Sequence, residues 1–117
     1  MAEGAYRYDA RTNKLMLVSE QDIRPAVAGR QDFVKTAPVS LVLVSDGSKF
    51  GPNGAQMMGM ADAGYVSQNI CLYCSAANLA CVPRATMDAA QLRTALKLTE
   101  KQTPMLNNVV GHRVAGK

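Results

Sequence analysis

Aromatic side chains and histidine are scarce in this 117-residue chain: aromatic residues make up 5% of it, Trp is absent and there is a single His. One histidine leaves no evident Ser-His-Asp or Cys-His catalytic arrangement and too few ligands for a zinc site of the usual kind. Neither a GxGxxG loop nor a Walker phosphate loop is present. The sequence therefore argues against triad hydrolases and P-loop nucleotide-binding proteins.

Long apolar runs and clustered charge are missing as well. No apolar run approaches the length of a membrane span, and the first residues lack the apolar core of a signal peptide. The formal net charge is +4, but the basic residues are scattered and no three are consecutive. Nucleic-acid-binding surfaces cluster such residues and interleave them with aromatic ones. We therefore expect a cytoplasmic protein that binds neither a membrane nor a nucleic acid.

The residues that are present suit one globular domain over residues 1–117. Hydrophobic residues make up 48% of the chain and charged residues 19%, and seven residues are Met. A core of Met, Ala, Leu and Val packs adaptably and specifies its shape less sharply than an aromatic-rich core. Such a core is compatible with a chain that completes its core against another chain.

The three cysteines lie within 11 positions, and two of them form a CxxC motif, Cys71-Leu72-Tyr73-Cys74, followed by Cys81. A thioredoxin-type pair sits at the N-terminus of a helix, whereas this pair falls in the middle of a predicted helix and adjoins no Lys, Arg or His. Small, soft side chains one helical turn apart are also what a closely packed helix needs. We interpret the cysteines as free thiols that pack, and we predict no metal site.

The order of the apolar patterns predicts an α+β fold, with a small, mostly antiparallel sheet packed against a long central helix. In the first half we expect a β-hairpin over 5–19, a short helix over 20–28, a strand over 39–44 that is buried on both faces, and a loop over 45–59. In the second half we expect a helix over 61–79 capped by Asp62, a linker over 82–86, a helix over 89–98 capped by Asp88, and a strand over 105–110.

The predicted helix over 61–79 is apolar on nearly all sides. A helix of this kind is buried on nearly all sides, which is hard to achieve within one chain of this length. We therefore expect a homodimer, in which a second subunit covers the helix.

Beyond these patterns, the ordered string of segments resembles one known family. The strand "APVSLVLVSD" leads through a loop to "MADAGYVSQNICLYCSAANLACVPRATMD", and "AAQLRTALKLTEKQTPMLNNVVGHR" follows. This order and spacing resemble the C-terminal half of nitroreductase-like flavoproteins, and in particular of their short dehydrogenase-type members. The preceding segment, "AYRYDARTNKLMLVSEQDIRPAVAGRQDFVKTAPV", is similar to the middle of these proteins.

The resemblance implies an FMN-dependent oxidoreductase. Members of the family form intertwined homodimers with FMN at the subunit interface. NAD(P)H reduces the flavin, which passes electrons to a nitroaromatic, a quinone or a similar acceptor. The flavin carries the chemistry and the protein positions it, so no residue of this chain is predicted to be catalytic.

The resemblance also implies where FMN and substrate lie. The loop after the long helix supplies backbone groups to the flavin N5 and O4 edge, and in this sequence that loop is Val82, Pro83, Arg84, Ala85 and Thr86. Basic residues near the C-terminus help to hold the FMN phosphate, which makes Arg113 and Lys117 candidates. Met57 and Met58 are expected to line the substrate side.

The chain departs from the family in having no counterpart of its N-terminal phosphate-binding motif, rich in Arg and Ser, or of its early dimerising helices. We therefore expect residues 1–117 to form the C-terminal part of a nitroreductase-like domain. Two alternatives remain: a catalytically inactive remnant of the same fold that is stable through self-association, and a small thiol- or metal-binding protein.

Overall fold

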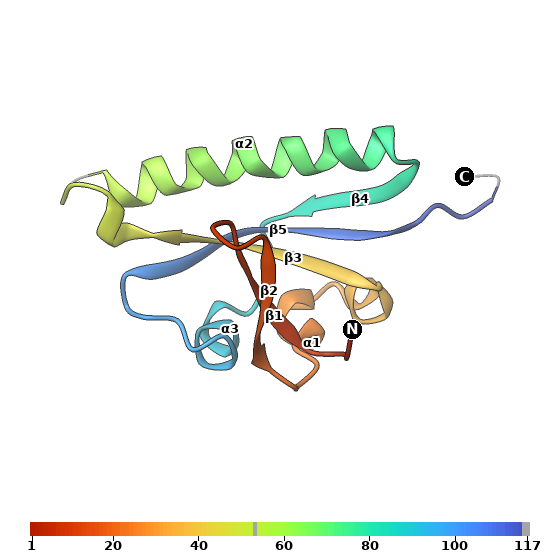
Figure 1. The fold of residues 1–117 in the computed structure, drawn as a ribbon, viewed down its shortest axis with the longest axis horizontal. Coiled ribbons are helices and arrows are strands. Elements are labelled where there is room, and N and C mark those ends of the chain that lie inside the picture. The colour runs from red at the N-terminus through yellow and green to blue at the C-terminus, as the bar shows by residue number, and fades with distance from the viewer. Residues whose placement is uncertain (53, 116–117) are drawn as a thin grey trace.

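The computed structural model describes residues 1–52 and 54–115 and has three layers. Figure 1 shows the long helix α2 (Ala55–Ala76) on one face of a sheet and the shorter helices α1 (Arg24–Ala28) and α3 (Ala89–Ala95) on the other. The predicted α+β fold, with a mostly antiparallel sheet against a long helix, is confirmed. Among the described residues, no helix is both long enough and apolar enough to cross a membrane.

The chain begins with a β-hairpin, as the sequence predicts. Strands β1 (Ala5–Asp9) and β2 (Lys14–Ser19) pair antiparallel and form a two-stranded sheet of their own. Asn13 takes the left-handed conformation at the turn, with φ 53°, as Asn does readily. The Asp9 carboxylate accepts hydrogen bonds from the Thr12 hydroxyl and the Arg11 N–H, which together lower the pKa of Asp9.

The main sheet has three antiparallel strands in the order β3-β5-β4, so the last strand in sequence is central. Strand β5 (Gln102–His112) is longer than the predicted strand over 105–110 and includes Pro104. Pro104 has no N–H to donate, and the pairing of β5 with β3 (Val39–Asp46) shifts register beside it, between Leu43 and Val44. A bulge is the place where a central strand tolerates proline.

Helix α2 begins earlier than predicted, and the expected loop over 45–59 is wrong. Strand β3 extends to Asp46, a 3-10 turn η2 follows (Gly47–Lys49), and α2 starts at Ala55 with Gly54 rather than Asp62 in the N-cap position. The Gly residues of this stretch indicated a loop. Gly59, however, allows α2 to approach β3, because a Cβ there would lie 2.9 Å from the Cβ of Ser45.

Only a narrow line of α2 faces the sheet. Its buried residues are small and recur at helical spacing: Gly59, Ala63, Ser67 and Cys74. Most of the rest of the helix is exposed, including Met57 at 71%, Tyr65 at 75% and Tyr73 at 70%. One chain alone therefore buries the helix only along this line, and the expectation that a second subunit covers the rest stays a prediction.

Strand β3 also differs from its prediction. It lies at an edge of the sheet, and Val39, Leu41 and Val44 are each more than a third exposed, so it is not buried on both faces. An open apolar groove of about 370 Å³ runs between this strand and α2, lined in part by Leu41, Val66 and Tyr73. The layer under α2 is thus only partly closed.

The opposite face of the sheet holds the compact core. Ala26, Val27 and Ala28 of α1 meet Val34 of the 3-10 helix η1 (Asp32–Thr36), Leu92 of α3 and Val109 of β5. The helix predicted over 20–28 starts only at Arg24, with Pro25 in its first turn, and Gly29 ends it with φ 56°. Asp88 caps α3 as predicted, accepting from the Gln91 N–H at 3.1 Å, and the helix ends at Ala95 rather than near 98.

Candidate functional site

The segment predicted to be a linker over 82–86 begins as a β-strand. Strand β4 (Leu79–Arg84) pairs with β5 along one side and leaves its other side as a free edge of the sheet. Pro83, which lacks an N–H, is tolerated in such an edge strand. Val82, Pro83 and Ala85 are exposed, so their backbone is open to a ligand along this edge.

Arg84 is the exception, because its side chain is buried at 7% exposure. Its Nη1 donates to Val27 O at 3.0 Å and to Asn107 Oδ1 at 2.6 Å, and its Nη2 donates to Ala28 O at 2.9 Å. Its Nε donates to Gln31 Oε1 at 2.8 Å. Burial lowers the pKa of Arg84 from its ordinary value, but the guanidinium remains charged and gives its donors to the protein.

This guanidinium joins β4 to the C-terminal end of α1. The carbonyls of Val27 and Ala28 belong to the last turn of α1, where orphan C=O groups need a donor and the helix dipole favours a cation. The Arg84 guanidinium carbon also lies 5.7 Å from the centroid of the Phe33 ring, a cation–π distance. The side chain therefore fixes the end of β4 against the compact face of the molecule.

Beyond Arg84, the segment presents two free backbone donors. The Asn107 Nδ2 donates to Thr86 O at 3.2 Å, which holds the carbonyl side of this turn. Within residues 1–52 and 54–115, the N–H groups of Ala85 and Thr86 meet no hydrogen-bond acceptor. A backbone N–H without an acceptor inside the protein can donate to the polar edge of a bound ring.

Two neighbouring asparagines of β5 organise this region, and our sequence reasoning missed both. Asn107 and Asn108 are each fully buried and, as successive strand residues, face opposite sides of the sheet. Asn107 contacts Arg84 and Thr86, whereas Asn108 faces α2. Adjacent amides within an apolar strand are unusual, and this signal could have marked them as a polar network.

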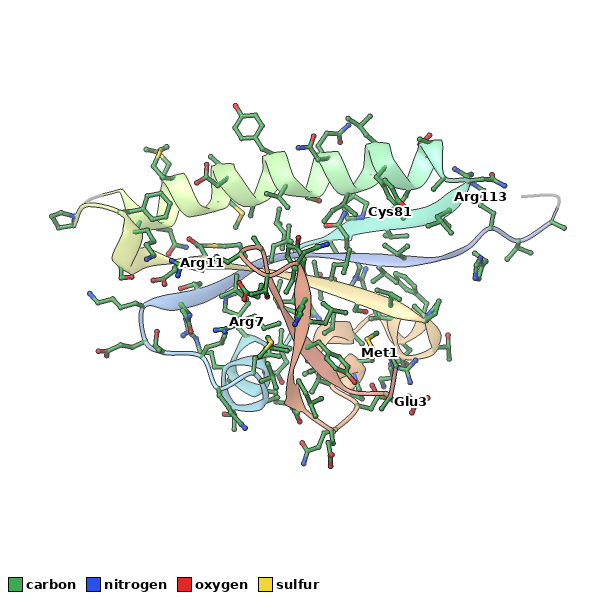
Figure 2. The ribbon with its side chains drawn as sticks, viewed as in Figure 1. Met1, Glu3, Arg7, Arg11, Cys81 and Arg113 are labelled. Atoms are coloured by element: carbon green, nitrogen blue, oxygen red, sulfur yellow. The ribbon has the colours of Figure 1, made fainter. Side chains whose placement is uncertain are left out.

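The remaining predicted residues lie at two different ends of the fold. Strand β4 runs back from the C-terminal end of α2 toward its N-terminal end (Figure 1), where Met57 and Met58 are exposed. Arg113 is exposed and follows His112, which pairs with Leu79 at the start of β4 (Figure 2). Lys117 lies outside the described residues.

In one chain, Arg113 and the N–H groups of Ala85 and Thr86 lie at opposite ends of β4. Leu79 and Arg84, the first and last residues of β4, lie about 17 Å apart along the strand. Arg113 lies beyond the first of these residues, and Ala85 lies beyond the second. Within one chain, the structure separates the two parts of the predicted cofactor site by the length of β4.

The three thiols lie between α2 and β4. All three cysteines are free, and Cys71 Sγ lies 3.5 Å from Cys81 Sγ. Burial is the largest cause that raises the pKa values of Cys71 and Cys74, so neither is an activated thiol. Among the described residues, no group of three or more His, Cys, Asp or Glu side chains is arranged to hold a metal ion.

These residues fit part of an FMN molecule. The exposed edge of β4 and the free N–H groups of Ala85 and Thr86 suit the polar edge of an isoalloxazine ring, which needs hydrogen-bond donors. Arg84 cannot also hold a phosphate, because its donors are engaged. Arg113 is exposed and suits a phosphate, but at the other end of β4.

This fold places a small antiparallel sheet, with one free edge, against a long apolar helix. Residues 2–112 match the sequence model of the Nitroreductase family, and the chain belongs to that family. The resemblance seen in the sequence is thereby confirmed.

Solved structures of other proteins share the fold. A protein of Ralstonia eutropha JMP134, provisionally named a nitroreductase, is 33% identical with a TM-score of 0.85, and the match covers 96% of this chain and 54% of that one. A protein of Clostridium acetobutylicum, provisionally named an NADH oxidase, is 24% identical with a TM-score of 0.58, covering 72% of this chain and 51% of that one; at this identity the likeness concerns the fold alone.

A third similar structure is that of a point mutant of NfnB, an FMN- and NADPH-dependent nitroreductase of a Sphingopyxis strain. It is 28% identical with a TM-score of 0.53, and the match covers 70% of this chain and 36% of that one. The chain thus spans about half the length of the first two structures and about a third of the last. No curated protein matches the chain.

Proposed function

We propose that this chain acts as an FMN-dependent oxidoreductase of the nitroreductase type, passing electrons from NAD(P)H to a nitroaromatic or quinone-type acceptor. The observation that carries the proposal is the family match over residues 2–112. It is supported by the similarity to NfnB, whose name states dependence on FMN and NADPH. Bound FMN would accept a hydride and donate electrons to the acceptor.

The residues of this chain would bind and orient the cofactor rather than react. Ala85 and Thr86 would donate their free N–H groups to the polar edge of the flavin ring. Asn107 and Arg84 would keep that segment in place from below, through Thr86 O and the end of α1. Met57 and Met58 would line the acceptor side as flexible apolar groups.

The site would be completed by a second copy of the chain. Arg113 lies at the opposite end of β4 from the free donors, so we propose that it reaches the FMN phosphate in the site of its partner. The exposed apolar face of α2, with Met57, Tyr65 and Tyr73, would supply the contact between the two copies. The role of Lys117, predicted beside that of Arg113, remains part of this proposal.

FMN and riboflavin together test both halves of the proposal. Ala85→Pro removes one ring donor and should weaken both ligands about tenfold, whereas Ala85→Ser keeps the N–H and serves as the matched control. Arg113→Ala removes a charge-assisted phosphate contact and should weaken FMN about ten- to a hundredfold while leaving riboflavin, which has no phosphate, unchanged. Both affinities are measured by quenching of flavin fluorescence on titration with protein.

Two outcomes would count against this function. A purified protein that is colourless and does not quench FMN fluorescence would favour the alternative, an inactive remnant of the fold. If Arg113→Ala lost equal affinity for FMN and for riboflavin, the Arg113 side chain would lie away from the phosphate. Sedimentation of the wild-type protein over a range of concentrations reports separately on the homodimer.

A further inference from the structure

The pair of sulfurs at Cys71 and Cys81 has no part in the proposed flavin chemistry. The two Sγ atoms lie 3.5 Å apart, across the contact between α2 and β4. A disulfide bond is about 2.05 Å long, so the sulfurs need to approach by only about 1.5 Å. Figure 2 shows Cys81 on β4 beneath α2.

The chain around the pair keeps the two thiols opposite each other. Helix α2 ends at Ala76, and Asn78, with φ 57°, turns the chain directly into β4. The two elements then pack against each other, so Cys71 and Cys81 face one another although ten positions separate them. Both are only partly buried, which leaves a route for a small reagent.

A buried amide also contacts both sulfurs. Asn108, fully buried in β5, directs its Nδ2 to Cys81 Sγ at 3.4 Å and to Cys71 Sγ at 3.6 Å. Its Oδ1 has no hydrogen-bond partner within the described part of the chain. An N–H directed at a sulfur favours the thiolate, the form that reacts.

We infer that Cys71 and Cys81 form a reversible intramolecular disulfide when the protein meets a hydroperoxide. One thiolate attacks an oxygen of the O–O bond, which gives a sulfenic acid and releases an alcohol, or water when the oxidant is hydrogen peroxide. The second thiol attacks that sulfur, the S–S bond forms and water leaves. The two thiols lose two electrons and the peroxide gains them, and a dithiol reverses the reaction.

The third cysteine, Cys74, could compete with Cys71 for the bond to Cys81. Cys74 lies one turn beyond Cys71, is 2% exposed and is one of the residues that line the apolar groove. Cys81 also raises the pKa of Cys74, after burial, through its charge and a side-chain hydrogen bond, so it lies close to both thiols. The 3.5 Å contact between sulfurs is the one that joins Cys81 to Cys71. The geometry therefore favours the Cys71–Cys81 bond, and Cys74 should remain a thiol.

The oxidation should be slow at neutral pH and faster in alkali. Burial raises the pKa of Cys71, and the groups that act on it are the neighbouring thiols Cys81 and Cys74 and the Asn108 amide. No charged side chain from α2, β4 or β5 is among them. Since the thiolate is the nucleophile, the rate should rise as the pH approaches that raised pKa.

Differential alkylation tests the pairing. The full chain is treated with hydrogen peroxide, free thiols are blocked with light iodoacetamide, and the protein is reduced with dithiothreitol and labelled with heavy iodoacetamide. Trypsin leaves all three cysteines in one peptide, residues 50–84, because no Lys or Arg lies between Lys49 and Arg84. Fragment ions of that peptide then assign each label. C-terminal fragments that begin after Met60 contain no methionine, so sulfoxides on Met57, Met58 and Met60 do not shift them.

We expect heavy label on Cys71 and Cys81 and light label on Cys74. Cys74→Ser should give the same bond, whereas Cys71→Ser and Cys81→Ser should give no intramolecular bond. A Cys74–Cys81 bond, a bond only between chains, or light label on all three cysteines after prolonged peroxide at alkaline pH would overturn the inference. None of these readouts requires flavin, so a failure here is distinct from a failure of the proposed function.

A second measurement follows the bond through the thermal stability of the protein. The bond closes a loop of about ten residues, which should raise the Tm of the oxidised wild-type protein by roughly 10 °C over the reduced protein. Cys74→Ser should show the same rise and Cys81→Ser none. An oxidised protein with the Cys71–Cys81 bond and an unchanged or lower Tm would mean that the bond forms only by distorting the fold.

Discussion

The two faces of the main sheet differ in how completely they are packed. On one face, α1, η1 and α3 enclose a core whose members are at most 5% exposed, and Arg84 ties β4 to the end of α1. On the other, α2 contacts the sheet through a line of small residues and leaves Tyr65, Leu72 and Tyr73 more than half exposed. The first face is complete within one chain, whereas the second has the composition of a surface that meets another chain.

Arg84→Met should have the largest effect on the complete face. The variant keeps an apolar stem but takes the Arg84 donor away from the Val27 carbonyl and from Asn107 Oδ1, whereas Ala28 O keeps the Gln31 N–H. Two such groups lose about 3–5 kcal/mol of unfolding free energy together. Urea unfolding followed by far-UV circular dichroism measures the loss.

Arg113→Met is the matched control for that measurement. Arg113 is exposed, and its replacement should change the unfolding free energy by less than about 0.5 kcal/mol. Equal stability of the two variants would mean that the Arg84 hydrogen bonds do not hold the faces together. Arg84→Lys should fall between them, because Lys keeps the charge but not the planar fork.

A pair of leucine variants compares the two faces directly. Leu92 is fully buried in α3, and Leu92→Ala should remove about 2–5 kcal/mol at every protein concentration. Leu72 is 58% exposed on α2, so Leu72→Ala should change the unfolding free energy of dilute protein by less than about 0.5 kcal/mol. Urea unfolding at low protein concentration gives both values.

The two leucine variants should also differ in their effect on the association of two copies. If the exposed face of α2 joins two copies, Leu72→Ala should weaken the dimer in sedimentation experiments, while Leu92→Ala should act through stability alone. A wild-type protein that stays monomeric at high concentration would remove the distinction and leave α2 exposed in solution.

The sequence predicted the elements better than their boundaries or their burial. Alternation and turn residues were enough for the hairpin over 5–19, and the aliphatic run was enough for β3. The start of α2 was misjudged because Gly and Met residues at its beginning resemble a loop. Gly59 is there because the helix approaches Ser45 of β3, a contact between distant segments that local patterns do not reveal.

The candidate site was predictable only through the resemblance. The order of segments shared with the family pointed to Val82–Thr86. Nothing in the local sequence, however, distinguishes the exposed residues of that stretch from Arg84, which is buried. The burial of Arg84 depends on acceptors more than 50 positions away, at Val27, Ala28 and Gln31. Long-range partners of this kind are decided by the fold, so a motif can give the segment without giving the role of each side chain.

Two glycines of α2 give smaller effects than Arg84 or Leu92 and test how the helix rests on the sheet. Gly59→Ala places a methyl group 2.9 Å from Ser45 Cβ and 3.1 Å from Met105 Cε, so the helix or these neighbours must shift. The expected loss is about 1–3 kcal/mol of unfolding free energy. Gly64→Ala meets no atom within 4 Å and should instead stabilise the helix by about 1 kcal/mol, because Ala is the better helix former.

Thermal unfolding measures whether each variant is more or less stable than the wild-type protein. All three proteins are compared at a concentration where they are monomeric. Opposite shifts in Tm would mean that α2 is held close to β3 along one line and is free on its other side. A loss in Gly64→Ala as well would require a contact on the outer face of α2 even in the dilute chain. In that case the incomplete face is closed by the chain itself, and the comparison between the two faces would no longer hold.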